Sequence, residues 1–170
     1  MSRYFLGVFS IALSATAVLA AQQAPPPQFV TEAAASNVAE VEMSRMAAQK
    51  STNREVKRFA QMMIEDHTKA GKELQALAKQ HHWKLPTAPT SEHKSTLTDL
   101  RKKSGADFDR AYASEMLKDH EKDVELFRQA ASQEQLDPKL RQFAQKTLPT
   151  LEHHLAEARQ LNSEVASAAK

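Results

Sequence analysis

The sequence predicts an all-α protein, and more specifically an up-down four-helix bundle. The 170 residues include 28 Ala but only 3 Gly, and this composition favours helices over strands. Apolar residues recur at spacings of three and four along four long stretches, as they do on the buried face of a helix. Because the links between these stretches are short, we expect the helices to run alternately up and down around one core.

The first 20 residues have the pattern of a secretory signal peptide. Arg3 is basic, and residues 5–19 are apolar and uncharged, which is short for a membrane span. Small residues around Ala20 predict cleavage there, although an uncleaved membrane anchor is the alternative. Cleavage would give a periplasmic or secreted protein without a stable membrane span. Residues 21–28, with three consecutive prolines, are then a stiff leader, and residues 29–166 are the helical domain.

Two long helices are expected in the first half of the domain. The first covers about residues 31–49, with Thr31 as its N-terminal cap. The second covers about residues 53–81, since Thr52 and Glu55 have the spacing of a capping box.

A short extra helix and two long helices are expected in the second half. The short helix covers residues 91–103, and Gly105 is expected to cap its C-terminal end. The third long helix follows over about residues 107–132. The fourth covers about residues 138–165 after Asp137 and Pro138, and Pro149 within it should bend it.

Composition excludes several kinds of function. With no Cys, the chain has no disulfide, no thiolate zinc site and no catalytic cysteine. The formal charge of +2 gives no reason to expect a nucleic-acid partner. No Gly-rich phosphate loop and no Gly-x-Ser-x-Gly motif occurs. A non-enzymatic protein with an unidentified partner in the cell envelope is therefore expected, and the sequence does not indicate its oligomeric state.

Three histidines fall on the predicted apolar faces of three different helices. His67 follows Met63 by four residues, and His120 follows Met116 by four. In the last helix, apolar residues at alternating four- and three-residue spacings place His154 on the buried seam. At about 1.5 Å per residue, the three positions lie within about one turn of the same height. The three rings are therefore expected to meet in one layer of the core.

This layer has the chemistry of a transition-metal site. Neutral imidazole is a good ligand for Zn, Cu or Fe, and Glu40, on the inner face of the first helix, is a possible fourth ligand. Asp66 and Asp119 each precede a seam histidine and are candidates for orienting an imidazole on a neighbouring helix. The hypothesis is a divalent metal held by His67, His120 and His154, with or without Glu40.

A polar core layer without a metal is the alternative. Polar seam residues commonly fix the register of packed helices. Local pairs at a spacing of three residues, between His120 and Asp123 and between His154 and Glu157, would satisfy two of the rings. The remaining histidines receive no role and are expected in loops or on the surface: His81, His82, His93 and, flanking the seam, His153.

Several segments together resemble a known bacterial family. They are residues 39–42, residues 59–67, residues 105–120 and residues 143–155. In combination they resemble the family called domain of unknown function 4142, over about residues 29–161. Members of this family are often labelled secreted or outer-membrane proteins, and the resemblance implies a ferritin-like four-helix bundle in the periplasm with no established activity.

The chain departs from the ferritin-like pattern in one respect that bears on function. Ferritin-like di-iron sites use Glu-x-x-His pairs, and no Glu of this sequence has a His three residues later. A di-iron oxidase or iron store is therefore not expected. The sequence leaves two functions open: a non-catalytic binding or envelope-maintenance bundle, and a metal-binding or metal-dependent redox bundle.

Overall fold

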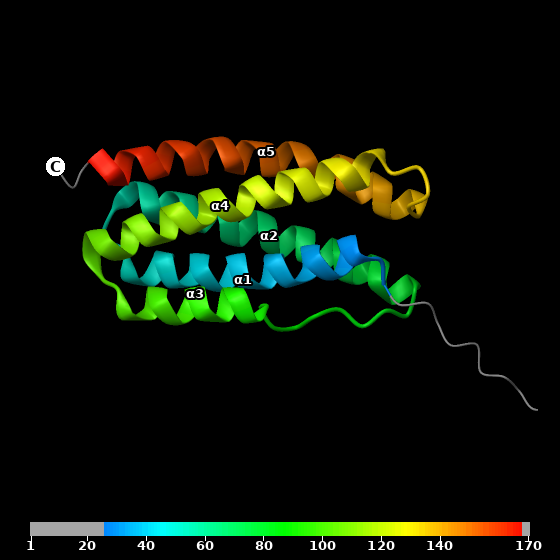
Figure 1. The fold of residues 1–170 in the computed structure, drawn as a ribbon, viewed down its shortest axis with the longest axis horizontal. Helices are drawn as coiled ribbons and strands as arrows, with labels where there is room; N and C mark the ends of the chain where they lie inside the picture. Colours follow the sequence, from blue (N-terminus) through cyan, green and yellow to red (C-terminus); the bar gives the residue numbers. More distant parts are fainter. Residues whose placement is uncertain (1–25, 168–170) are drawn as a thin grey trace, which may run out of the picture.

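A computed structural model describes residues 26–167, and in that range the chain is all-helical (Figure 1). The expected signal peptide and residues 21–25 of the leader lie outside the described residues. The bounds of the helices agree closely with the predicted ones, except that the first begins at Gln28 and not at Thr31. The helices are α1 Gln28–Lys50, α2 Arg54–Gln80, α3 Ser91–Lys102, α4 Gly105–Ser132 and α5 Pro138–Ser167.

Short polar side chains cap the starts of α2, α3 and α5, though not always the predicted ones. The predicted capping box is wrong, because Asn53 and not Thr52 caps α2. Its Oδ1 accepts from the backbone N–H groups of Glu55 and Val56 at 2.9 and 3.3 Å. The prediction for α5 is confirmed, since Oδ1 of Asp137 accepts from a backbone N–H in the first turn of that helix.

The junction between α3 and α4 differs from the expected glycine cap. Lys103 follows the last residue of α3, and Gly105 is instead the first residue of α4, with a φ of 54° that disfavours other residues. The end of α3 is satisfied by a lysine of α1. Nζ of Lys50 donates to the carbonyl oxygens of Arg101 and Lys103 at 2.8 and 2.6 Å, which ties α3 to α1.

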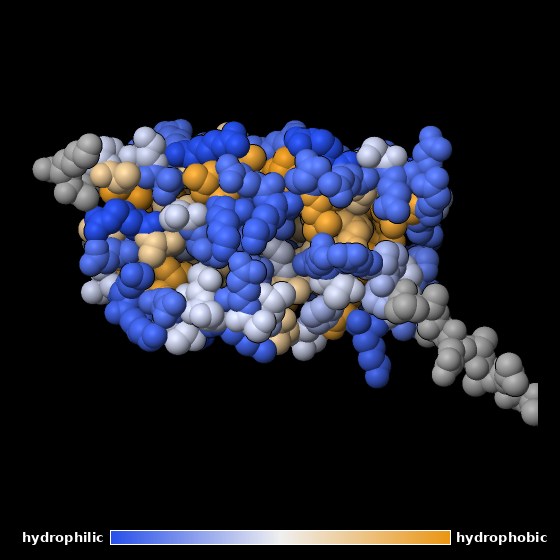
Figure 2. All heavy atoms as spheres, viewed as in Figure 1, coloured by the Kyte–Doolittle hydropathy of each residue, from blue (hydrophilic) through white to orange (hydrophobic). Residues whose placement is uncertain are grey.

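The four long helices enclose the core, and α3 covers one side of it. α4 packs along α5 and α1 packs along α2, while contacts of α1 with α4 and of α2 with α5 close the arrangement. Figure 1 shows α3 alongside α1, on the side away from α5. Hydrophilic side chains cover most of the face in Figure 2, with apolar atoms visible between them. Within residues 26–167, no helix combines the length and hydropathy needed to cross a membrane.

The buried core consists of two apolar clusters. Most residues of the predicted apolar stripes are buried, including Leu140, Leu151 and Leu161 of α5, while Thr147 of the same stripe is only partly buried. Between the two clusters, near the middle of each long helix, lies a buried polar layer. Glu40, His67, His120 and His154 supply it from α1, α2, α4 and α5 respectively.

Candidate metal centre

Three imidazole rings meet at the centre of the molecule. His67 is 5% exposed, and His120 and His154 are fully buried. One ring nitrogen of each lies within 4.8 Å of the others. The ring centroids are 5.3–5.5 Å apart. The predicted convergence of these rings in one layer is therefore found, and we call these three residues the histidine triad.

One nitrogen of each ring faces a partner outside the triad. Nδ1 of His120 lies 2.9 Å from the carbonyl oxygen of Met116, which can only accept, so Nδ1 carries the proton. Nε2 of His154 donates to Oδ2 of Asp66 at 2.9 Å. Nδ1 of His67 lies 3.0 Å from Oε2 of Glu40. These contacts engage one nitrogen of each ring.

The opposite nitrogen of each ring has no partner. Nε2 of His67, Nε2 of His120 and Nδ1 of His154 are buried and make no hydrogen bond. Because a neutral imidazole protonated on one nitrogen carries a lone pair on the other, the layer contains three lone pairs without a donor. Unpaired polar atoms of this kind are rare in native cores and costly to bury.

Burial keeps these rings neutral. It lowers the pKa of His67, of His120 and of His154 to about 4, well below the ordinary value for histidine. At neutral pH the triad therefore carries no charge, and neutral imidazole is the form that ligates metals. Burial also raises the pKa of Glu40 to about 7 and, with repulsion from neighbouring carboxylates, raises the pKa of Asp123.

Glu40, predicted as a possible fourth ligand, lies on the outer side of the rings. Its Oε2 faces Nδ1 of His67 at 3.0 Å and its Oε1 faces Nδ1 of His120 at 3.5 Å. The unpaired nitrogens of these two rings are the Nε2 atoms. Glu40 thus lies against the ring nitrogens opposite the unpaired ones, which disfavours it as a ligand of the same ion, although neither of its oxygens makes a hydrogen bond.

The two aspartates predicted to orient the rings are placed differently. Asp66 of α2 bonds His154 of α5, as a carboxylate that orients an imidazole on a neighbouring helix does. Asp119 is buried, and its Oδ1 lies 3.5 Å from Nε2 of His93. Asp66 is therefore in contact with the triad, whereas Asp119 faces a histidine outside it.

The surface position expected for His93 is wrong. Its side chain is only 12% exposed and lies against Asp119. The signal was present in the sequence, because His93 precedes the buried Leu97 by four residues and Leu100 by seven. Two apolar positions in a short helix are too few to establish a helical period, so the sequence spacing did not predict the burial of His93. His153, in contrast, is exposed as expected.

The local pairs proposed as the alternative to a metal site are also wrong. Asp123 does not bond His120, and instead accepts from Oγ of Ser36 of α1 at 3.1 Å. Glu157 does not bond His154, and instead pairs with Arg58 of α2 at 2.7 Å. Neither pair satisfies a ring of the triad.

The space beside the triad is small. A cavity of about 20 Å³ is bounded by Glu40, His67 and Gly71 among mainly apolar residues, which is room for about one water molecule. Gly71 lies one turn after His67, where a Cβ atom would stand 2.6 Å from Nδ2 of Asn37. The absence of a side chain at Gly71 thus leaves room for the Asn37 side chain of α1 beside α2.

Comparison with known proteins identifies the family. Residues 12–161 match the family model described as Domain of unknown function (DUF4142). The chain belongs to this family. Neither the curated proteins nor the solved structures gave a match. The family description names no activity.

Proposed function

We propose that this DUF4142 chain binds one divalent transition-metal ion through His67, His120 and His154. The observation that carries the proposal is that each of three buried imidazoles, from three helices, has a ring nitrogen without a partner, and that the three rings offer ligand atoms within 4.8 Å of one another. A metal ion accepts all three lone pairs at once and so removes the cost of burying them unpaired.

The ligand set favours Zn, Cu or Fe over harder ions. Imidazole is a borderline ligand that suits these metals, and Cu(II) is expected to bind most tightly among them. Tetrahedral bonds of 2.0–2.1 Å would put the nitrogens about 3.3 Å apart. From separations of at most 4.8 Å, the nitrogens must therefore approach one another by up to about 1.5 Å.

The surroundings support binding more than catalysis. Three protein ligands leave one position of a tetrahedral ion open, and the cavity that borders His67 of the triad has room for only about one water molecule. The contacts of Asp66, Glu40 and the Met116 carbonyl would hold the rings for binding. We therefore propose a non-catalytic metal-binding protein, with a redox role for bound Cu or Fe as the second possibility.

We also propose, on the sequence, that the chain is exported and acts in the cell envelope with an unidentified partner. The signal-like residues 1–20 and the lack of Cys support export. The packing of four long helices supports an up-down four-helix bundle of the ferritin-like type, with α5 bent at Pro149. Cell fractionation and N-terminal sequencing of the processed chain test export. Recovery of the full chain in the cytoplasm would contradict it.

The test of metal binding compares two adjacent histidines. His154→Leu removes a fully buried member of the triad, and His153→Leu makes the same change on the exposed face of α5. The metal-free chain and both variants are titrated separately with Zn²⁺ and Cu²⁺ in a calorimeter, and metal content is measured after dialysis.

We expect one metal ion per chain for the unmodified protein and for His153→Leu. We expect His154→Leu to lose at least tenfold in affinity while remaining folded, since leucine fills a similar volume in the core. Equal binding by the two variants, or no binding by the unmodified chain, would contradict the proposal.

A further inference from the structure

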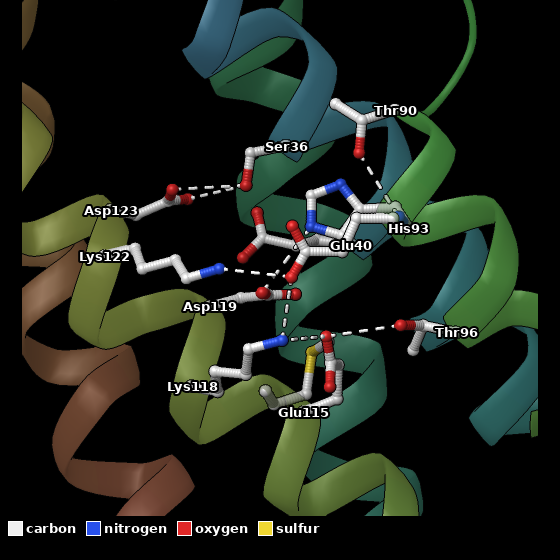
Figure 3. Close-up of polar contacts among 12 residues, drawn as sticks. Ser36, Glu40, Thr90, His93, Thr96, Glu115, Lys118, Asp119, Lys122 and Asp123 are labelled. Atoms are coloured by element: carbon white, nitrogen blue, oxygen red, sulfur yellow. Dashed lines mark hydrogen bonds and ion pairs between the residues drawn. The ribbon is translucent and has the colours of Figure 1, made fainter.

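A second group of buried polar side chains lies where α1, α3 and α4 meet. His93 comes from α3, Asp119 and Asp123 come from α4, and Glu40 of α1 lies beside them (Figure 3). Asp119 is 2% exposed and Asp123 is 7% exposed. None of His93, Asp119 and Asp123 belongs to the histidine triad, so this group is separate from the ligands of the proposed metal centre.

Two atoms of this group have no partner. Oδ2 of Asp119 and Nδ1 of His93 are buried without a hydrogen bond. The other atoms of these two side chains face each other, with Oδ1 of Asp119 3.5 Å from Nε2 of His93. An unpaired carboxylate oxygen on a side chain this deeply buried is costly, and a bound cation removes that cost.

A pocket of about 330 Å³ opens beside these atoms. His93, Asp119 and Asp123 line its inner part together with Ser36 and Thr90. This volume is large enough for a cation with several of its water molecules, unlike the small cavity beside His67. Oxygen-preferring divalent cations commonly keep part of their water shell when proteins bind them.

The charges around the pocket favour a cation. Four acidic residues line it, namely Glu32, Glu92, Asp119 and Asp123, against the single lysine Lys122. Nζ of Lys122 lies 3.4 Å from Oε1 of Glu92 at the exposed rim. Because this lysine is paired there, its charge does not oppose a cation beside the buried carboxyl groups of Asp119 and Asp123.

We propose that His93, Asp119 and Asp123 form a second cation site, distinct from the histidine triad, for an oxygen-preferring divalent ion of the Mn²⁺ class. Two carboxylates and one imidazole suit Mn²⁺, and water molecules in the pocket complete its coordination. Glu40, which faces His67 and His120, lies between the two sites. The chain therefore offers a nitrogen site in its dry core and an oxygen-rich site open to solvent.

The test measures Mn²⁺ binding directly. Free Mn²⁺ gives a six-line electron paramagnetic resonance signal that weakens as the ion binds, so titration of the full chain gives affinity and stoichiometry. The test variant Asp119→Asn/Asp123→Asn keeps the shape of both side chains and removes their charge. The control Glu121→Gln/Glu125→Gln removes two exposed charges from the same helix. His93→Gln and His154→Leu are titrated in parallel.

We expect one Mn²⁺ per chain with a dissociation constant of about 10⁻⁴ M or tighter. The double aspartate variant and His93→Gln should each weaken binding at least tenfold. The control and His154→Leu should bind as the unmodified chain does, which separates this site from the triad. No loss of the free signal, or equal binding by the double aspartate variant, would overturn the proposal. Loss of Mn²⁺ binding in His154→Leu alone would assign the ion to the triad instead.

Discussion

The two apolar clusters and the polar layer between them are equally buried, but they differ in how their polar atoms are satisfied. In one cluster the only phenol is paired, since the hydroxyl groups of Tyr112 and Ser44 lie 2.9 Å apart. In the polar layer and the His93–Asp119 pair beside it, by contrast, several buried polar atoms have no hydrogen-bond partner. Of the eight buried side-chain atoms without a partner in residues 26–167, seven belong to these two groups, and the eighth belongs to Asp109.

This difference indicates which part of the molecule is built for stability and which for binding. Packing at the two ends gains free energy from apolar burial, whereas each unpaired polar atom in the middle costs about 1–3 kcal/mol. The apolar clusters thus hold the rings in an arrangement that is unfavourable without a ligand. Four predictions test this comparison.

The largest effect is expected from breaking an apolar cluster. Phe59 is 1% exposed and packs against Tyr112, so Phe59→Ala should lower the free energy of unfolding by about 3–5 kcal/mol. Urea unfolding followed by circular dichroism measures it, with Lys57→Ala at an exposed position of α2 as the control. A loss no larger than that of the control would show that the cluster does not stabilise the fold.

Metal binding should stabilise the protein by a similar amount. A ligand that binds only the folded state at 100 to 1,000 times its dissociation constant adds about 3–4 kcal/mol. Zn²⁺ should therefore raise the melting temperature of the unmodified chain, measured by calorimetry. His154→Leu should show no such rise, and an equal rise in this variant would place the zinc elsewhere.

Removing the charge of Glu40 should stabilise the metal-free protein in alkaline solution. Burial raises the pKa of Glu40 to about 7 from 4.5, so the folded state holds a proton that the unfolded state releases between these values. The free energy of unfolding therefore falls as pH rises through this window. Glu40→Gln should remove the fall and add about 1–3 kcal/mol at pH 8.

The exposed Glu42 of the same helix provides the matched control for this experiment. Glu42→Gln should leave the dependence of stability on pH unchanged. Urea unfolding at pH 5 and pH 8 measures both variants. If the stability of Glu40→Gln and that of the unmodified chain changed equally between pH 5 and pH 8, the raised pKa of Glu40 would be contradicted.

The smallest effect on stability is expected from the protonation of a triad histidine in acid. Burial lowers the pKa of His120 to about 4 from 6.5. Between these pH values the imidazole is protonated in the unfolded state and neutral in the folded state. Stability is complete above pH 6.5 and is lost as pH falls toward 4. His120→Leu should make the metal-free protein about 1–2 kcal/mol less sensitive to a change from pH 7 to pH 5. His153→Leu should retain the original slope.

The sequence predicted the fold and the triad through the same signal. The three- and four-residue spacing that placed Leu151 and Leu161 in the core also placed His154 there, because the period of a helix does not depend on the residue type. For the same reason the convergence of His67, His120 and His154 followed from helix lengths. The spacing did not show which nitrogen of each ring stays unpaired.

The contacts between helices were not predictable in this way. The roles of Glu40 and Asp119 depend on how α1 and α3 are rotated against α4, and nothing in the linear spacing fixes that rotation. Asp123 illustrates the point, since local spacing paired it with His120 whereas packing pairs it with Ser36. His93 was missed because its helix carries only two buried apolar residues, Leu97 and Leu100.

The most direct test of the metal centre is anomalous diffraction from crystals of the zinc-loaded protein, recorded at the zinc absorption edge. The account predicts a peak between the three rings, about 2.0–2.1 Å from Nε2 of His67, Nε2 of His120 and Nδ1 of His154. A peak bound to the opposite nitrogens, a peak at surface histidines alone, or no peak in the core would contradict it.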